Sequence, residues 1–241
     1  MEKQEVIFKD LGVMEYQAAW EYQEKLLHEN VKRKSLVYTH DSETLDSHSL
    51  LPTSHYLLFV EHPPVYTLGK SGNKENILLD DDGLKEKKIQ FFNTNRGGDI
   101  TFHGPDQLVG YPILDLEKFY TDIGRYLRNL EEVVILTMAE YGIKGDRSAG
   151  ETGVWIEPGV PGRERKICAI GVRCSRWITM HGFALNVNTD LSYFNHIIPC
   201  GIQNKQVTSL EKELGKKVGY DEVKEKIRAN FEKVFEATAV F

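Results

Sequence analysis

Apolar and polar residues alternate with two different periods near the start of this chain, and these periods predict a strand followed by a long helix. Residues 5–12 alternate with a period of two, which is typical of a strand. Residues 14–34 instead repeat apolar side chains every three or four positions, as a helix does. These helical positions are Ala18, Tyr22, Leu26 and Leu27.

Short apolar runs in the middle of the chain predict a large sheet. Residues 55–69 are expected to form a strand, a turn and a strand, because Pro63 and Pro64 cannot both belong to a continuous ladder. Residues 39–54 are rich in Ser, Thr and Asp without an apolar period, which predicts a surface loop. Further strands are expected at residues 88–93, 107–116 and 164–175.

Apolar residues at helical spacing predict two further helices, at residues 120–142 and 220–237. Gly142 is expected to end the first of them. Thr208 and Glu211 fit a capping box for a short helix before the last one. The helical apolar positions are Ile123, Leu127, Leu130, Val134, Met138, Val223, Ile227, Phe231, Val234 and Phe235. Because helices flank and interrupt the strands without regular βαβ alternation, we expect an α+β fold with helices packed on a mixed sheet.

Composition narrows the classes of protein to which this fold can belong. The chain has 241 residues, of which 41% are hydrophobic and 27% charged, as in ordinary globular proteins. No linker-like stretch divides it, so residues 1–241 are expected to form one domain. The formal net charge of −6 argues against a general nucleic-acid binder, whose affinity comes from Lys and Arg on phosphates.

The cysteines and the apolar runs bear on compartment. Cys168, Cys174 and Cys200 cannot all pair, and none forms the CxxC pair of a zinc or redox site, so we expect reduced thiols and no metal. No stretch of 18 apolar residues and no secretory leader pattern is present, so we expect a cytoplasmic protein without a membrane span. We also expect a monomer.

The apolar rhythm breaks first at residues 95–110, NRGGDITFHGPDQLVG. Gly97 and Gly98 allow a close backbone approach, and Arg96 and His103 add a fixed cation and a titratable nitrogen. An acyl or phosphate site is one interpretation. The other is a glycine turn between strands with a hydrogen-bonded histidine.

A second candidate is Lys166, which begins the run KICAIGV. In an unbulged strand it shares a face with Cys168, Ile170 and Val172. Partial burial disfavours the charged form of a lysine, so an amine in that position becomes a usable base. The alternative is a solvated lysine at the end of an edge strand.

The third candidate is Cys200, in the stretch FNHIIPCGI. Pro199 and Gly201 predict an irregular backbone that can present the thiol to a cleft, whereas Cys168 and Cys174 lie among apolar residues as core thiols do. A buried, inert Cys200 is the alternative, and strand parity leaves Cys168 open as a second thiol near Lys166.

Five segments of the chain resemble the octanoyltransferases of lipoate biosynthesis, also called lipoyl(octanoyl) transferases or lipoate-protein ligase B. They are EHPPVYTLGKSG, RGGDITFHGPDQLVGYPILDL, TGVWI, KICAIGVRCSRWITMHGFALNVNTDLSYFNHIIPCGI and VTSLEKELG. They extend from about residue 56 to residue 215, and motifs of this length and order are far more specific than any single spacing. One departure is Asp106, where the family pattern has glycine after HGP.

The resemblance implies the fold of biotin and lipoate protein ligase catalytic domains, a mixed sheet packed with helices. It implies transfer of octanoate from octanoyl-acyl carrier protein to a lysine of lipoyl domains, in 2-oxoacid dehydrogenase E2 subunits and the glycine cleavage H protein. It implies Cys200 as nucleophile, Lys166 as its base, and no cofactor. The acyl pocket that it implies consists of Arg96, Gly97, Gly98, Asp99, Ile100, Thr101, Phe102, His103, Ala169, Ile170, Gly171, His181, Gly182, Phe183 and Ala184.

Residues 144–176 carry a local basic excess, with seven Lys and Arg against four Asp and Glu, a net of +3. This excess either steers an acidic partner or belongs to a solvated loop.

Three rival functions are open at this point. They are an ATP-dependent lipoate or biotin ligase, an acyl-binding module without turnover, and a cysteine hydrolase that uses His103, His181 or His196.

Overall fold

Two β-sheets form the framework of the molecule. The computed structural model describes residues 3–38, 52–198 and 206–241. The larger, eight-stranded sheet has the order β10-β8-β9-β6-β2-β1-β11, with β7 paired to β8. Its strands are β1 (Gln4–Val13), β2 (His55–Glu61), β6 (Gln107–Ile113), β7 (Val154–Ile156), β8 (Arg165–Ser175), β9 (Ile178–Asn186), β10 (Gln206–Val207) and β11 (Ala237–Val240). The smaller sheet has the order β4-β3-β5, with β3 (Val65–Leu68), β4 (Gln90–Asn93) and β5 (Ile100–His103).

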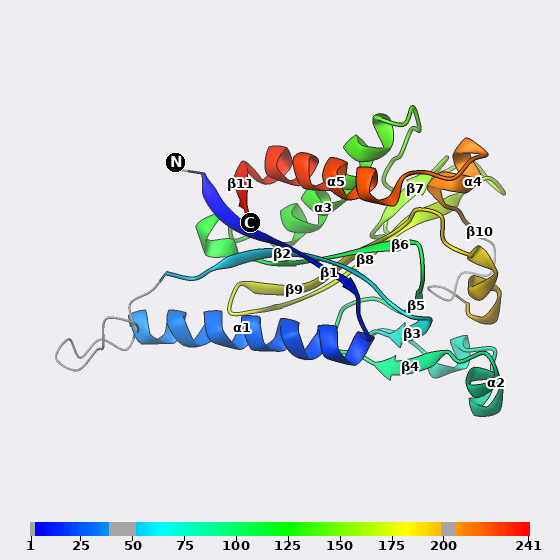
Figure 1. The fold of residues 1–241 in the computed structure, drawn as a ribbon, viewed down its shortest axis with the longest axis horizontal. Coiled ribbons are helices and arrows are strands. Elements are labelled where there is room, and N and C mark those ends of the chain that lie inside the picture. The colour runs from blue at the N-terminus through cyan, green and yellow to red at the C-terminus, as the bar shows by residue number, and fades with distance from the viewer. Residues whose placement is uncertain (1–2, 39–51, 199–205) are drawn as a thin grey trace.

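Helices cover both faces of the larger sheet. Helix α1 packs on β6 and β9 on one face, while α3 and α5 pack together on the other (Figure 1). The helices are α1 (Tyr16–Tyr38), α2 (Asp81–Glu86), α3 (Ile123–Ala139), α4 (Leu210–Leu214) and α5 (Tyr220–Phe235), with 3-10 turns η2 (Lys74–Asn76), η3 (Leu116–Lys118) and η4 (Leu191–His196). Parallel pairs such as β1–β2 and antiparallel pairs such as β8–β9 occur in the same sheet, which confirms the α+β prediction. Among the helices of the described residues, none has the length and apolar content that crossing a membrane requires.

Three details of the predicted elements are wrong. The buried stripe of α1 runs through Ala19 and Gln23 instead of the exposed Ala18, because Gln23 accepts a hydrogen bond from the sheet. The short helix α4 is capped by Ser209, whose side chain accepts from Lys212 N, and not by Thr208. The last helix ends at Phe235, where a left-handed residue turns the chain into strand β11 beside β1. Residues 39–51 of the predicted surface loop lie outside the described residues.

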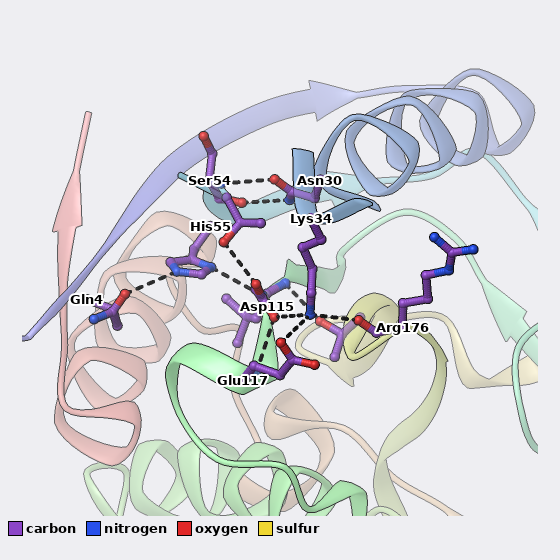
Figure 2. A network of polar contacts seen from close by, with 11 residues as sticks. Gln4, Asn30, Lys34, Ser54, His55, Asp115, Glu117 and Arg176 are labelled. Carbon is purple, nitrogen blue, oxygen red and sulfur yellow. Dashed lines mark hydrogen bonds and ion pairs between the residues drawn. The ribbon is translucent and has the colours of Figure 1, made fainter. Parts of the chain in front are cut away.

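A buried polar network anchors the C-terminal half of α1 to the sheet (Figure 2). Lys34 is 8% exposed, and its Nζ lies 2.8 Å from Asp115 Oδ1 and 3.0 Å from Glu117 Oε2. It also donates to the carbonyl of Arg176, in the turn between β8 and β9. A charge pair this deeply buried is stable only when its hydrogen bonds are satisfied, so the network fixes how α1 lies on the sheet.

His55 joins this network as a neutral imidazole. Its Nδ1 accepts from the backbone N–H of Asp115, so the ring proton lies on Nε2 and is donated to Gln4 Oε1 (Figure 2). Burial lowers the pKa of His55 to about 4. Protonation therefore requires breaking a hydrogen bond in the core.

Residues 94–99 join the two sheets. Arg96 Nη2 donates to the carbonyl oxygen of Thr67 on β3 at 2.6 Å, and Gly97 N donates to the carbonyl oxygen of Val172 on β8 at 2.9 Å. A Cβ added at Gly171 would lie 2.8 Å from the carbonyl oxygen of Gly97, closer than real Cβ atoms come. The absence of a side chain at Gly171 therefore sets the spacing between the sheets.

We predict that His55 makes stability depend on pH. Its pKa is about 4 in the folded protein and ordinarily about 6.5, so its contribution to stability is present above pH 6.5 and is lost as pH falls towards 4. The shift corresponds to a loss on the order of 3 kcal/mol. In His55→Asn, the Asn oxygen can still accept from Asp115 N but does not titrate. Urea unfolding at a series of pH values should show a shallower fall for this variant. Parallel curves would contradict the assignment.

We predict that Gly171→Ala disrupts the junction of the sheets. The added methyl meets a backbone oxygen that cannot move aside as a side chain does, so the free energy of unfolding should fall by about 1–3 kcal/mol. Gly97→Ala is the matched control, because a Cβ there has its nearest neighbour at 3.5 Å, an ordinary contact. Equal denaturation midpoints for the two variants would refute the argument.

Candidate active site

A cavity of about 630 Å³ opens where the two sheets meet. This volume lies in the range of roughly 300–1,000 Å³ that is usual for small-molecule sites. The start of α1, the glycine segment 96–98, strands β5, β6, β8 and β9, and the loop at residues 150–152 all contribute to its walls. Helix α3 adds Ile123 and Leu127, two half-buried apolar side chains that the helical spacing assigned to the core.

The structure brings most of the predicted site residues together around this cavity. Phe102 is the exception, because its ring lies in the core of the small sheet and stacks on Tyr193 at 4.6 Å. Cys200 lies outside the described residues. The predicted residues that line the cavity are Lys166, Arg96, Gly97, Gly98, Asp99, Ile100, Thr101, His103, Ala169, Ile170, Gly171, His181, Gly182, Phe183 and Ala184.

Several lining residues were not predicted from the sequence. Tyr16, Gln107, Tyr111 and Asn186 all face the cavity. Gln107 begins strand β6 and Asn186 ends strand β9, and a polar residue at the end of a mainly apolar run was the signal available. Tyr16 and Tyr111 gave no such signal, because aromatic residues are ordinary in a helix or strand core.

Lys166 lies on β8 with its side chain half-buried. Its Nζ is 4.5 Å from the centre of the Trp155 ring on β7. The predicted common face with Cys168 is wrong, because the register with β7 shifts between the Trp155–Lys166 and Val154–Cys168 pairs, and Ile167 is the extra residue. Cys168 is fully buried in the apolar core, and burial raises the pKa of its thiol. A thiol in that environment is not a nucleophile.

A row of hydrogen bonds fixes His103 at one end of the cavity. Gln107 Nε2 donates to the carbonyl of Phe102 and to Asn186 Oδ1, so Gln107 Oε1 accepts from His103 Nδ1 at 2.9 Å. The other ring nitrogen lies 3.4 Å from the hydroxyl of Thr67. Both nitrogens of His103 are therefore committed to protein partners.

His181 is fixed in a similar way from the side of α1. Asn95 Nδ2 donates to Glu24 Oε1, so Asn95 Oδ1 accepts from His181 Nε2 at 2.8 Å. The backbone N–H of His181 donates to Gln23 Oε1, and its φ of 57° places a non-glycine residue in the left-handed region. This backbone conformation is costly and persists only where the surroundings determine it.

The cavity holds both histidines neutral. Burial lowers the pKa of His181 to about 3, with Arg96 and Arg173 acting in the same direction. Burial also lowers the pKa of His103, and His62 and Arg96 add to that effect. Burial raises the pKa of Tyr16 to about 12, so this phenol is neutral as well. The walls thus suit an uncharged chain, with Lys166 as an amine beside it.

Two further observations limit the chemistry. The N–H of Gly97 is already bonded to Val172, so it is not available to a substrate oxygen. Within the parts of the chain that the structure covers, no group of three His, Cys, Asp or Glu side chains is arranged to hold a metal ion.

Comparison with known proteins shows the family to which the chain belongs. A family model described as the lipoyl protein ligase A/B catalytic domain matches residues 15–232. An octanoyltransferase of Flavobacterium johnsoniae is 60% identical over 96% of this chain and 97% of its own length. An octanoyltransferase of Christiangramia forsetii is 56% identical over 97% of each chain.

Solved structures agree on the fold. A bipartite lipoate protein ligase of Thermoplasma acidophilum has a TM-score of 0.65 at 17% identity, covering 100% of this chain and 88% of its own. A lipoate-protein ligase A bound with ATP has a TM-score of 0.64 at 14% identity, covering 100% and 90%. The fold is that of the lipoate protein ligases, and the high identity to the octanoyltransferases over nearly the whole chain makes it an acyltransferase. The chain belongs to the lipoyl protein ligase A/B catalytic-domain family and, within it, to the octanoyltransferases of lipoate biosynthesis.

Proposed function

We propose that this acyltransferase moves octanoate from octanoyl-acyl carrier protein to the acceptor lysine of lipoyl domains, through a thioester on Cys200 with Lys166 as base. The acceptors are the lipoyl domains of 2-oxoacid dehydrogenase E2 subunits and the glycine cleavage H protein. The observation that carries the proposal is the kinship with octanoyltransferases, together with Lys166 in the wall of the cavity.

The first half-reaction forms the acyl-enzyme. Lys166 accepts the thiol proton of Cys200, and the thiolate attacks the octanoyl carbonyl. The bond to the sulfur of the carrier arm breaks, and Lys166 returns the proton to that sulfur. One thioester is exchanged for another, so no ATP is consumed.

The second half-reaction forms the amide. The amino group of the acceptor lysine attacks the Cys200 thioester and loses a proton to Lys166. The carbon–sulfur bond breaks, and the proton returns to the Cys200 sulfur. A thioester donor and an amine acceptor are thermodynamically matched for this step.

The described neighbours of Cys200 in the sequence support its role. Phe194 precedes it and Val207 follows it, and both line the cavity. Val207 pairs with Lys166 in the sheet, and Thr208 N donates to the carbonyl of Lys166. The apolar walls suit the octanoyl tail, since six methylenes that leave water contribute about 5 kcal/mol.

The rival functions fit the site less well. A cysteine hydrolase needs a basic imidazole, but both nitrogens of His103 are engaged, and His181, with a pKa of about 3, is a weak base. His196, on η4, is not among the residues that line the cavity. An ATP-dependent ligase activates a free acid and has no need of a nucleophilic cysteine. The likeness to the ATP-bound ligase, at 14% identity, shows the fold alone.

Ion pairs engage four of the seven basic residues that make up the local excess. Ion pairs engage Arg147 with Glu131 and Glu132, and Arg165 with Glu157 and Glu213. Arg163 and Arg173 are paired as well, with Glu157 and Glu24. These pairs favour a structural role for the arginines over steering of an acidic carrier protein.

We predict that Cys200→Ala abolishes the acyl-enzyme. Intact-protein mass spectrometry after mixing with octanoyl-acyl carrier protein, without ATP, should show an octanoyl adduct on the wild type and none on this variant. Cys174→Ala is the matched control, because Cys174 is the less buried of the two free thiols among the described residues, and this variant should keep the adduct. An adduct on Cys200→Ala, or octanoyl-adenylate formed only with ATP, would overturn the thioester route.

We predict that Lys166→Ala slows formation of the acyl-enzyme by a factor of about 10² to 10⁴, the usual contribution of a general base. Rapid-quench mass spectrometry measures this rate directly. A rate within about threefold of the wild type would remove Lys166 from the mechanism.

A further inference from the structure

Residues 147–154 form a loop that lies between helix α3 and Lys166 in the sequence. Its ends are joined by two backbone hydrogen bonds of 2.9 Å between Asp146 and Trp155. Its tip, residues 150–152, lines the cavity. The loop is therefore a short closed segment that forms one wall of the site.

The side chain of Lys166 rests against this loop. A Cβ added at Gly153 would lie 3.5 Å from Lys166 Cε and 2.5 Å from the carbonyl oxygen of Cys168. The centre of the Trp155 ring lies 4.5 Å from Lys166 Nζ. Gly153 thus lies close to the stem of Lys166, and Trp155, the residue that follows the loop, lies against its amine, so a displacement of the loop would disturb both contacts.

Glu131 on α3 fixes the loop from behind. Its side chain is fully buried, and its Oε1 accepts from the backbone N–H of Gly153 at 3.0 Å. Oε1 also lies 2.9 Å from Arg128 Nη2, and Oε2 lies 3.0 Å from Arg147 Nε. Both carboxylate oxygens are therefore used, and Glu131 itself does not line the cavity.

Arg147 completes the attachment from the loop. Besides Glu131, its guanidinium donates to Glu132 Oε2 at 2.6 Å and to the carbonyl of Arg128 at 3.0 Å. Glu131 thereby holds the loop at two points, through Arg147 near its start and through Gly153 near its end. Loss of one partner leaves buried charge or a buried N–H without its bond, which is strongly unfavourable.

We infer that Glu131 is a positioning residue of the acyl transfer, which acts by holding residues 147–154 against Lys166. The inference rests on the proposed role of Lys166 as the base. A misplacement of about 1 Å in a reacting group can lower a rate about a hundredfold. Glu131 therefore governs the rate of the chemical step through the position of Lys166.

The test compares Glu131→Gln with Asp115→Asn. Both replace a buried carboxylate in an ion pair by its amide, but Asp115 belongs to the network of Figure 2 and does not line the cavity. Two quantities are measured on each folded variant: kcat and KM for octanoyl-acyl carrier protein, and the rate at which acetic anhydride acetylates Lys166, read by peptide mass spectrometry. The labelling rate reports the position of Lys166 whether or not Lys166 is the base.

For Glu131→Gln we expect kcat to fall about tenfold to a hundredfold and Lys166 labelling to rise about fivefold. Asp115→Asn should change neither. Labelling and kcat equal to those of Asp115→Asn would overturn the inference. If Glu131→Gln does not fold, Arg147→Lys takes its place, because this variant loses the hydrogen bonds of the guanidinium to Glu132 and Arg128. It should likewise lower kcat and raise Lys166 labelling. Raised labelling in Glu131→Gln, together with full activity in Lys166→Ala, would show that Glu131 holds Lys166 in place, but would refute the role of Lys166 as base and with it the effect of Glu131 on the acyl transfer.

Discussion

The close approach of residues 96–98 to strand β8 is the contact on which the cavity depends. It exists because no Cβ separates Gly171 from the carbonyl of Gly97, and because Arg96 reaches from this segment to Thr67 on the second sheet. The space between the two sheets is the cavity itself. Its width is therefore set by backbone packing, which is stiffer than any arrangement of side chains.

The burial of the cavity also determines the protonation state of its two histidines. Burial, with a guanidinium beside them, keeps two imidazoles unprotonated. Each imidazole has its tautomer fixed by an amide whose own orientation is fixed by a further partner. The two histidines therefore add no charge to the mainly apolar wall of the cavity near neutral pH. Such a wall accommodates an alkyl chain without attracting water to a charge beside it.

The sequence allowed much of this architecture to be predicted, wherever the apolar rhythm was long. Strands β2, β6 and β8 and helices α1, α3 and α5 all coincide with predicted segments. The strands appear in the sequence as apolar runs, and the helices as apolar residues at helical spacing. Strands β5, β10 and β11 are two to four residues long, too short to display a period. The sequence does not reveal the bulge at Ile167. This bulge breaks the period-of-two alternation that the prediction of a common face for Lys166 and Cys168 assumed. The resemblance in motifs predicted many of the residues that line the cavity. Phe102 of strand β5 does not line it, because its ring stacks on Tyr193 in the core of the small sheet.

The row from Thr67 through His103 and Gln107 to Asn186 and Thr208 has a single direction, because every donor in it faces an acceptor. A glutamate in place of Gln107 would lack the amide protons that Asn186 and Phe102 receive, and would favour a charged His103. No member of the row can thus be exchanged alone without leaving a neighbour mismatched. In evolution, Gln107 and Asn186 would have to change as a pair, so the row constrains the divergence of two strands that are far apart in the sequence.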